Sequence, residues 1–282
     1  MKSDCHIHMV LDGMEWRGAI ARHKNGPDTA FIRAALGRYQ DLGYTYLRDG
    51  GDRWGAGAMA RDLAPEYGIR YRTPLAPLCK AGHYGGFIGE KYENLREYAD
   101  LVKKTREMGG DFIKIMISGL MDFDRAGVLT EEGYPAHEIR ELVHIAHEEG
   151  FAVMAHCNGA ATIRAAAEAG VDSVEHGAYA DEEALIAMAE NKTVWVPTLS
   201  TVGNLRGKGR FDETAVAAIY ADTSGKLRTF AGMGGLIACG SDAGAWAVPH
   251  DADTEESLLL SVLGPGAEAV LARGTAMIQE KF

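Results

Sequence analysis

Two histidines near the N-terminus, His6 and His8, are the residues of this sequence best suited to bind a metal ion. They lie in a short apolar segment that is predicted to be a β-strand, and alternate side chains of a strand point to the same face. Two imidazoles on one face of a buried strand lose hydration unless a ligand compensates for the loss, and a divalent metal ion is the usual ligand. The spacing therefore predicts a metal site.

Further polar side chains stand at the C-terminal ends of other apolar segments, namely Lys114, His156, His176 and Asp242. His156 and His176 offer two nitrogens to a second metal ion, and Asp242 offers a carboxylate oxygen. A lysine in a dry interior has a lowered pKa, so its neutral amine can react with carbon dioxide to form a carbamate. That anion has two oxygens and would bridge two metal ions. A hydroxide held between the metals would be the nucleophile, and Asp242 would pass its proton to the leaving group.

The elements that must position these residues alternate along the chain. Strands are expected at residues 3–8, 45–49, 69–74, 112–117, 152–156, 173–176, 194–198 and 236–239. Helices are expected at 28–42, 57–67, 94–108, 135–149, 160–169, 181–191, 212–233 and from 255 onward. Such alternation implies an α/β fold with a parallel sheet. Polar residues at the ends of five strands can meet only if the strands surround one centre, which favours a single (β/α)8 TIM barrel over residues 1–282 rather than an open sheet.

The composition limits the classes of partner. The chain has 282 residues and a net charge of −11, and this acidic balance argues against nucleic acid or an anionic membrane as the main partner. The N-terminal residues lack the apolar segment of a signal peptide, and no run of about 18 apolar residues is present. Four widely spaced cysteines are typical of a reduced protein. We therefore expect a cytoplasmic enzyme with a small-molecule substrate, and a homo-oligomer remains an option.

Cys5 and Cys157 are expected to point away from the adjoining histidines into packing, with metal ligation as the alternative. His250 is expected to be a solvated loop residue, with a substrate contact as the alternative.

The ordered motifs "DCHIHM", "FIKIMISG", "VMAHCNG", "SVEHGAY" and "ACGSDAG" resemble the amidohydrolase superfamily. The segments "LGYTYLRDGG", "GGDFIKIMISG" and "AAEAGVDSVEHG" resemble the branch that includes imidazolonepropionase and the Xaa-Pro metallodipeptidases. The resemblance extends from Asp4 to Trp246. It implies a (β/α)8 barrel of the metal-dependent hydrolase type with two divalent metal ions, of which zinc is the expected metal, and hydrolysis of an amide or related bond.

The resemblance also implies a role for each site residue. His6, His8 and Asp242 would bind the more buried metal ion, His156 and His176 the more exposed one, and Lys114 would be the carboxylated bridge. Mononuclear deaminases of the superfamily lack this lysine and carry a glutamate three residues after the histidine of strand five. Here that position is Gly159, so the deaminase pattern fails.

The chain departs from the branch in one respect. Relatives carry a β-sandwich before the first strand, whereas five residues precede His6 here and 40 follow Asp242. We therefore expect a barrel without the N-terminal β-sandwich.

The motifs do not determine the substrate. A dipeptide or an N-acyl amino acid is the first expectation. A lactonase or phosphotriesterase, a cyclic amidohydrolase, and a non-catalytic barrel that binds a ligand are the alternatives, because a fold does not determine a substrate. His83 and Tyr84, in "KAGHYGGF" after the third strand, are candidate substrate contacts, with a purely structural role as the alternative. Arg48 and Asp49 are expected to be structural.

Overall fold

The computed structural model describes residues 2–250 and 253–282. Its strands are β1 (Lys2–Ile7), β2 (Tyr44–Asp49), β3 (Arg70–Arg72), β4 (Leu78–Lys80), β5 (Glu90–Tyr92), β6 (Ile113–Met116), β7 (Val153–Cys157), β8 (Ser173–His176), β9 (Val194–Val196) and β10 (Leu236–Ile237). Its helices are α1 (Trp16–His23), α2 (Thr29–Asp41), α3 (Ala56–Leu63), the 3-10 helix η1 (Ala64–Tyr67), α4 (Leu95–Glu107), α5 (Ala136–Glu148), α6 (Ala160–Glu168), α7 (Glu182–Glu190), α8 (Ser200–Gly203), α9 (Glu213–Gly232), α10 (Glu255–Leu263) and α11 (Ala267–Lys281).

The strands form two parallel ladders. The third strand of the barrel is divided between them, because β3 belongs to one ladder and β4 to the other. One ladder has the order β1-β2-β3, and the other has the order β10-β9-β8-β7-β6-β4-β5. β3 pairs with β2, whereas β4, a few residues later, pairs with β6. Pro74 and Pro77 lie between them, and proline cannot donate a hydrogen bond to a ladder. The third barrel strand is therefore interrupted rather than continuous.

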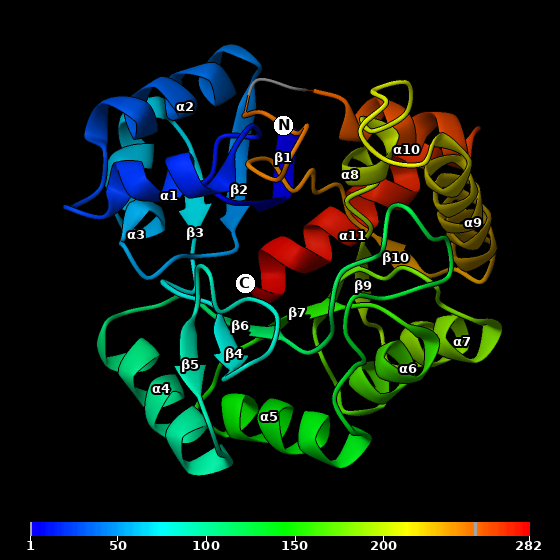
Figure 1. Cartoon of the computed structure of the whole chain (residues 1–282), viewed down its shortest axis with the longest axis horizontal. Coiled ribbons are helices and arrows are strands. Elements are labelled where there is room, and N and C mark those ends of the chain that lie inside the picture. The colour runs from blue at the N-terminus through cyan, green and yellow to red at the C-terminus, as the bar shows by residue number, and fades with distance from the viewer. Residues whose placement is uncertain (1, 251–252) are drawn as a thin grey trace.

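Hydrogen bonds between the first strand and the segment around β10 close the barrel. The Cys5 amide donates to the carbonyl of Cys239 at 2.9 Å, and the Asp242 amide donates to the carbonyl of His6 at 2.7 Å. A further parallel bridge joins Ile7 to Ala243. The helices surround these strands, as Figure 1 shows in a view along the barrel. The arrangement is the predicted (β/α)8 barrel.

The N-terminal end of the barrel is filled by apolar side chains and by the last helix. Phe112, Ile278 and Phe282 belong to one buried cluster that is contributed by the bottom of the strands and by α11. The rings of Phe112 and Phe282 lie 5.2 Å apart, edge to face. Figure 1 shows α11 lying across the centre of the molecule behind the strands. This packing closes the N-terminal end and leaves the other end, where the strands terminate, as the open mouth of the barrel.

The predicted strands and helices are present, with ends that differ by a few residues. The sequence pattern did not predict α1, α8, β4 or β5. The N-terminal cap of α1 is Glu15, whose carboxylate accepts from Arg17 N and Gly18 N, and glutamate is not among the residues that usually signal a helix start. Among the described helices, none combines the length and the apolar character needed to cross a bilayer.

Helix α11 can pack against β10 only because residue 274 is glycine. A Cβ atom added to Gly274 would lie 2.0 Å from the carbonyl oxygen of Ile237. We expect Gly274→Ala to lower the free energy of unfolding by about 1–3 kcal/mol, the usual cost of overpacking. A matched change, Gly225→Ala in α9, meets no atom within 4 Å and should be neutral or stabilising. Chemical denaturation of both variants measures the difference, and equal stability of the two would contradict this account of the packing.

Candidate metal centre

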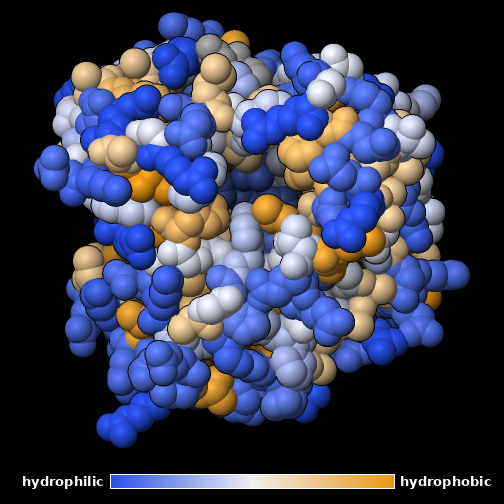
Figure 2. All heavy atoms as spheres, in the orientation of Figure 1, coloured by the Kyte–Doolittle hydropathy of each residue, from blue (hydrophilic) through white to orange (hydrophobic). Residues whose placement is uncertain are grey.

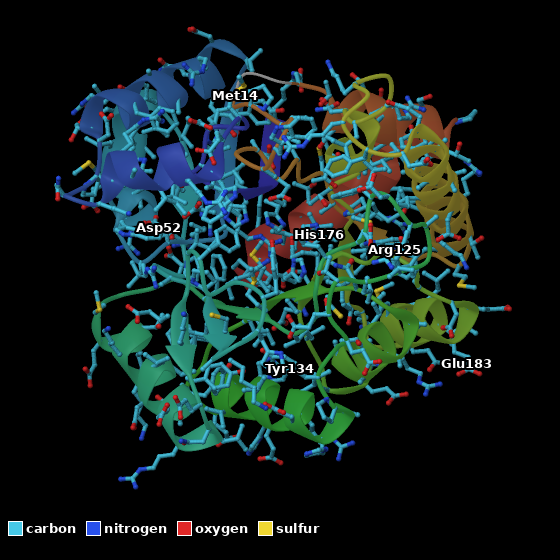
Figure 3. The ribbon with its side chains drawn as sticks, viewed as in Figure 1. Met14, Asp52, Arg125, Tyr134, His176 and Glu183 are labelled. Carbon is cyan, nitrogen blue, oxygen red and sulfur yellow. The ribbon has the colours of Figure 1, made fainter. Side chains whose placement is uncertain are left out.

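The six residues predicted to form a metal site come together at the C-terminal end of the barrel. They lie in β1, β6, β7 and β8 or in the segments that follow β1 and β10, and are His6, His8, Lys114, His156, His176 and Asp242. All six are buried, with exposed fractions of 8% or less. The ring centroids of His156 and His176 are 4.5 Å apart, and those of His6 and His176 are 5.3 Å apart. Figure 3 places His176 near the centre of the barrel, in the view along its axis.

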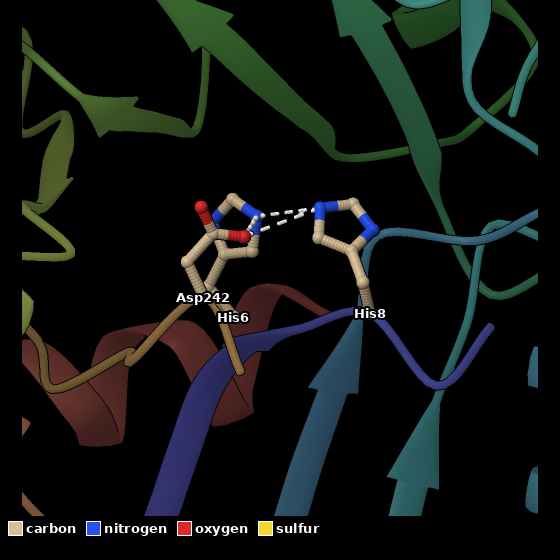
Figure 4. Close-up of side chains that lie close together, drawn as sticks. All are labelled: His6, His8 and Asp242. Carbon is tan, nitrogen blue, oxygen red and sulfur yellow. Dashed lines mark hydrogen bonds and ion pairs between the residues drawn. The ribbon is translucent and has the colours of Figure 1, made fainter. Parts of the chain in front are cut away.

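His6, His8 and Asp242 form a triangle of potential ligand atoms. His6 Nε2 and His8 Nε2 are 3.3 Å apart, and Asp242 Oδ1 lies 3.5 Å from the first and 3.4 Å from the second. Figure 4 shows the three side chains converging. Ligand atoms bound to a tetrahedral ion at about 2.0–2.1 Å lie about 3.4 Å from one another. The triangle thus has the dimensions of three corners of such a coordination sphere, and it is the one group of three potential ligands found among the described residues.

Lys114 lies beneath these groups without a partner. Its side chain is 1% exposed, and its Nζ atom has no hydrogen-bond partner in the described part of the chain. Burial lowers the pKa of Lys114 to about 8. An orphaned amine in a native interior requires an explanation, and a group that binds to the nitrogen would supply one. The donor set and this orphaned atom together fit a metal centre with a bridging anion.

The remaining two histidines are oriented by hydrogen bonds on one ring nitrogen. His156 Nε2 lies 3.1 Å from the carbonyl oxygen of Gly119, and His176 Nδ1 lies 2.7 Å from the hydroxyl oxygen of Thr198. These contacts leave His156 Nδ1 and His176 Nε2 free to act as ligands, the usual arrangement for a metal-binding histidine. Burial lowers the pKa of His156 to about 3 and the pKa of His176 well below its ordinary value, so both rings are neutral.

A buried ion pair below the centre orients His6. Glu175 Oε2 lies 2.7 Å from His6 Nδ1, and Glu175 Oε1 accepts from the Arg48 guanidinium at 2.8 Å. Arg48 also donates to Ser173 Oγ at 2.9 Å and lies 4.4 Å from the ring centroid of Phe282. Glu175 escaped the sequence analysis because it precedes a stronger candidate, His176, although an acidic residue inside an apolar strand was a usable signal. Arg48 has the expected structural role, with Glu175 as its partner.

His8 and Asp242 each have one side-chain atom without a hydrogen-bond partner among the described residues. The atoms are His8 Nδ1 and Asp242 Oδ1. Burial raises the pKa of Asp242 to about 8 and lowers the pKa of His8 to about 3. Without a cation nearby, both groups therefore favour their neutral forms. A bound cation would favour the ionised carboxylate instead.

The backbone is strained where the site residues leave their strands. His176, Thr198 and Asp242 have φ values of 67°, 48° and 60°, in the left-handed region. This region is uncommon for residues other than glycine and is unfavourable for a β-branched residue such as threonine. Such strain persists where the surrounding structure enforces it, and it is found most often at functional sites. Thr198, which the sequence analysis missed, combines this strain with the contact to His176.

Of the two candidate substrate contacts, Tyr84 lies beside the centre, and His83 contacts a neighbouring loop. The ring of Tyr84 packs on that of His156 with centroids 4.7 Å apart. His83 forms a short contact with Glu131, whose other oxygen accepts from the Tyr84 amide at 2.9 Å. Glu131 comes from the loop after β6 and thus joins two loops at the barrel mouth. The sequence contains one signal for Glu131, namely its place in the long loop between the expected strand 112–117 and the expected helix 135–149.

Cys5 and Cys157 adjoin histidines of the site but are buried in apolar clusters, as expected, and are free thiols. His250, expected to be a solvated loop residue, is 2% exposed and contacts Tyr39 and the carbonyl of Leu11. That expectation was wrong because the loop folds back on α2 and the residues after β1.

Comparison with known proteins gives no match to a family model. Ochratoxinase from Aspergillus niger is 26% identical over 292 residues, which cover 85% of this chain and 56% of the relative. The chain therefore spans about half the length of the curated relatives it matches.

Solved structures resemble the whole chain. The crystal structure of a Xaa-Pro dipeptidase with bound methionine matches with a TM-score of 0.80 at 22% identity, over 99% of this chain and 75% of that one. The crystal structure of Aspergillus niger ochratoxinase matches with a TM-score of 0.78 at 22% identity, over 98% and 70%. The chain therefore shares the barrel fold of these structures.

Proposed function

We propose that this protein is a metal-dependent amidohydrolase with two divalent metal ions, expected to be zinc, and that residues 1–282 form its catalytic barrel. The observation that carries the proposal is the triangle of His6, His8 and Asp242 above the unpartnered amine of Lys114. His6, His8 and Asp242 would bind the more buried ion, and His156 and His176 the more exposed one. Three ligand atoms with metal-like spacing and a buried orphaned amine are costly to maintain without a bound group.

Lys114 would be the bridge between the two ions. A neutral Nζ forms a bond to the carbon of carbon dioxide and releases one proton, which gives an anionic carbamate with two oxygens. The lowered pKa of Lys114, about 8, increases the share of neutral amine at neutral pH. The proton released by the amine does not bind to His6, His8 or His156, because burial lowers the pKa of these rings.

When bound, the metal ions would supply Lewis acidity to the substrate carbonyl and acidity to an attacking water. The protein would then handle the proton. Asp242, through the carboxylate oxygen that does not bind the ion, would accept the proton from water and deliver it to the leaving nitrogen. Arg48 and Glu175 would hold His6 in one orientation, and Thr198 would do so for His176.

The proposed substrate is a dipeptide or an N-acyl amino acid. Two of the similar proteins are named ochratoxinase and Xaa-Pro dipeptidase, and a third is a prolidase complexed with N-methylphosphonate-L-proline. His83 and Tyr84 would contact the substrate, because Tyr84 packs directly on His156. A panel of dipeptides, N-acyl amino acids, lactones and phosphotriesters, assayed on the zinc-loaded chain, tests this choice. Turnover of lactones or phosphotriesters alone would overturn it.

Lys114→Ala should remove the bridge. We expect about two metal ions per chain in the parent protein, fewer than two in the variant, and loss of most activity. Short carboxylic acids such as propionate should restore part of the activity, because they can supply two bridging oxygens. Elemental analysis and turnover measure these effects.

The matched control is Lys80→Ala, whose ammonium group pairs with Glu138 outside the centre. It should keep its metal content. Full metal content and turnover in Lys114→Ala would exclude the bridging role.

Asp242→Asn should leave most of the bound metal in place and lower turnover by about 10²–10⁴-fold, the usual contribution of a general acid–base group. The amide keeps the shape of the side chain but cannot accept the proton in the same way. Steady-state kinetics measures the turnover of the variant, and elemental analysis measures its metal content. Asp111→Asn, at the opposite end of the barrel, serves as the control. Unchanged turnover in Asp242→Asn would remove this residue from the mechanism.

Glu175→Gln should weaken metal binding by about 10–100-fold, the usual effect of losing the group that orients a histidine ligand. Competition with a chromogenic chelator measures zinc affinity without any assay of turnover. Glu255→Gln is the matched control, because Glu255 is equally buried but accepts from Ser200 and the Leu199 amide rather than from a histidine. Equal zinc affinity in the two variants would show that Glu175 does not act through His6.

A further inference from the structure

A row of aromatic rings leads from the candidate metal centre to the protein surface. The first contact is that of Tyr84 with His156, at 4.7 Å between ring centroids. Tyr84 contacts Phe87 at 5.8 Å, and Phe87 contacts Trp16 at 5.4 Å in an edge-to-face arrangement. Each spacing lies in the range of favourable aromatic contacts. The row is therefore continuous from a proposed metal ligand to a surface tryptophan.

All three aromatic residues of the row lie at the C-terminal end of the strands. Trp16 begins α1, directly after the loop that follows β1, and Tyr84 and Phe87 belong to the loop that follows β4. The second loop is held in place because the Arg53 amide donates to the carbonyl of Ile88 at 3.0 Å and Glu131 accepts from the Tyr84 amide. The rings thus occupy set positions beside the barrel mouth, where substrates of such barrels bind.

The outer end of the row is exposed to solvent. Trp16 is 44% exposed, and Met14, just before it, is 73% exposed. The Arg17 guanidinium stacks on the tryptophan at 4.4 Å from its centroid. Figure 2 shows a hollow near the centre of this face of the molecule. Scattered exposed apolar side chains are ordinary, but a connected row that ends at a reactive centre is typical of a ligand groove.

A second aromatic group near the mouth does not offer the same surface. Phe123, Phe211 and Trp246 pack on one another, with centroid distances of 5.2 Å and 6.1 Å. They also pack against the buried side chains of Val202 and Leu205. Because these rings contact one another and this apolar cluster, they are explained by packing. In the row that ends at Trp16, Phe87 also packs against a buried apolar cluster. The outer ring, Trp16, is 44% exposed, so packing in the core does not explain its position.

We propose that the substrate carries an aromatic or extended apolar group on one side of its scissile amide, and that this group binds along Phe87 and Trp16. The proposal rests on the proposed amidohydrolase function and specifies its substrate class. The amide would lie at the metal centre beside Tyr84, and the apolar group would extend outward along the row. Stacking on a tryptophan ring adds to the gain from burial alone, so we expect about a tenfold preference, which corresponds to about 1.4 kcal/mol.

The test compares substrates that differ only in one apolar group. N-benzoyl-L-alanine adds a ring on the acyl side of N-acetyl-L-alanine, and N-acetyl-L-phenylalanine adds one on the amine side. On the metal-loaded chain, one of the two should have a kcat/KM about tenfold or more above that of N-acetyl-L-alanine. Trp16→Ala should lower kcat/KM for that substrate about tenfold more than for N-acetyl-L-alanine. Trp16→Phe keeps a ring and should restore most of the preference.

Met108→Ala is the control, because Met108 is 60% exposed at the end of α4, at the opposite end of the barrel. It should not change the preference. A parent protein that treats the three substrates alike, or a preference that survives Trp16→Ala, would overturn the inference.

A binding measurement separates this inference from the proposed function. Calorimetry compares the dissociation constants of benzoate and L-phenylalanine with those of acetate and L-alanine, and it requires no turnover. Tighter binding of one aromatic product that is lost in Trp16→Ala would support the groove even if no amide were hydrolysed. In that case the amidohydrolase proposal alone would fail. Hydrolysis without any aromatic preference would instead contradict the groove alone.

Discussion

The structure depends on the hydrogen bonds that join the first strand to the segment around the last one. The Asp242 amide donates to the carbonyl of His6 and the His8 amide donates to the carbonyl of Ala243, both at 2.7 Å. These bonds connect residues more than 230 positions apart and close the ring of strands. They also bring His6, His8 and Asp242 together, because each bond involves the backbone of a ligand residue. Closure and assembly of the candidate centre are thus one structural event.

A barrel closed in this way must accommodate charged groups in its interior. Arg48, Glu175 and Lys114 are all 1% exposed or less. Arg48 and Glu175 compensate each other directly, and the pair also orients His6, as expected for a buried charge that is paired and hydrogen-bonded. Lys114 has no such partner. The Arg48–Glu175 pair is therefore satisfied, whereas Lys114, His8 and Asp242 each keep one atom without a hydrogen-bond partner among the described residues.

The loops above the strands touch this interior where the ring of Tyr84 packs on His156. The row that ends at Trp16 belongs to the loops after β1 and β4, whereas the ligand triangle belongs to β1 and the segment after β10. Loops at this end of a barrel vary while the strands keep their positions. At the outer end of the row, Trp16 contacts Phe87 rather than a proposed ligand. Variants at Trp16 and variants at the ligands can therefore test the substrate class and the reaction separately.

The sequence by itself determined the alternation of strands and helices, the barrel class and the residues that meet at its C-terminal end, because periodicity and strand ends are local properties. It indicated that Lys114 is buried, since its neighbours are apolar. It did not determine the break between β3 and β4, the partner of Arg48, the contact of Thr198 with His176 or the aromatic row. Each of these depends on which segments become neighbours across the barrel. Such neighbours are separated by tens of residues or more in the chain, and only the closed tertiary structure brings them within hydrogen-bonding or van der Waals distance.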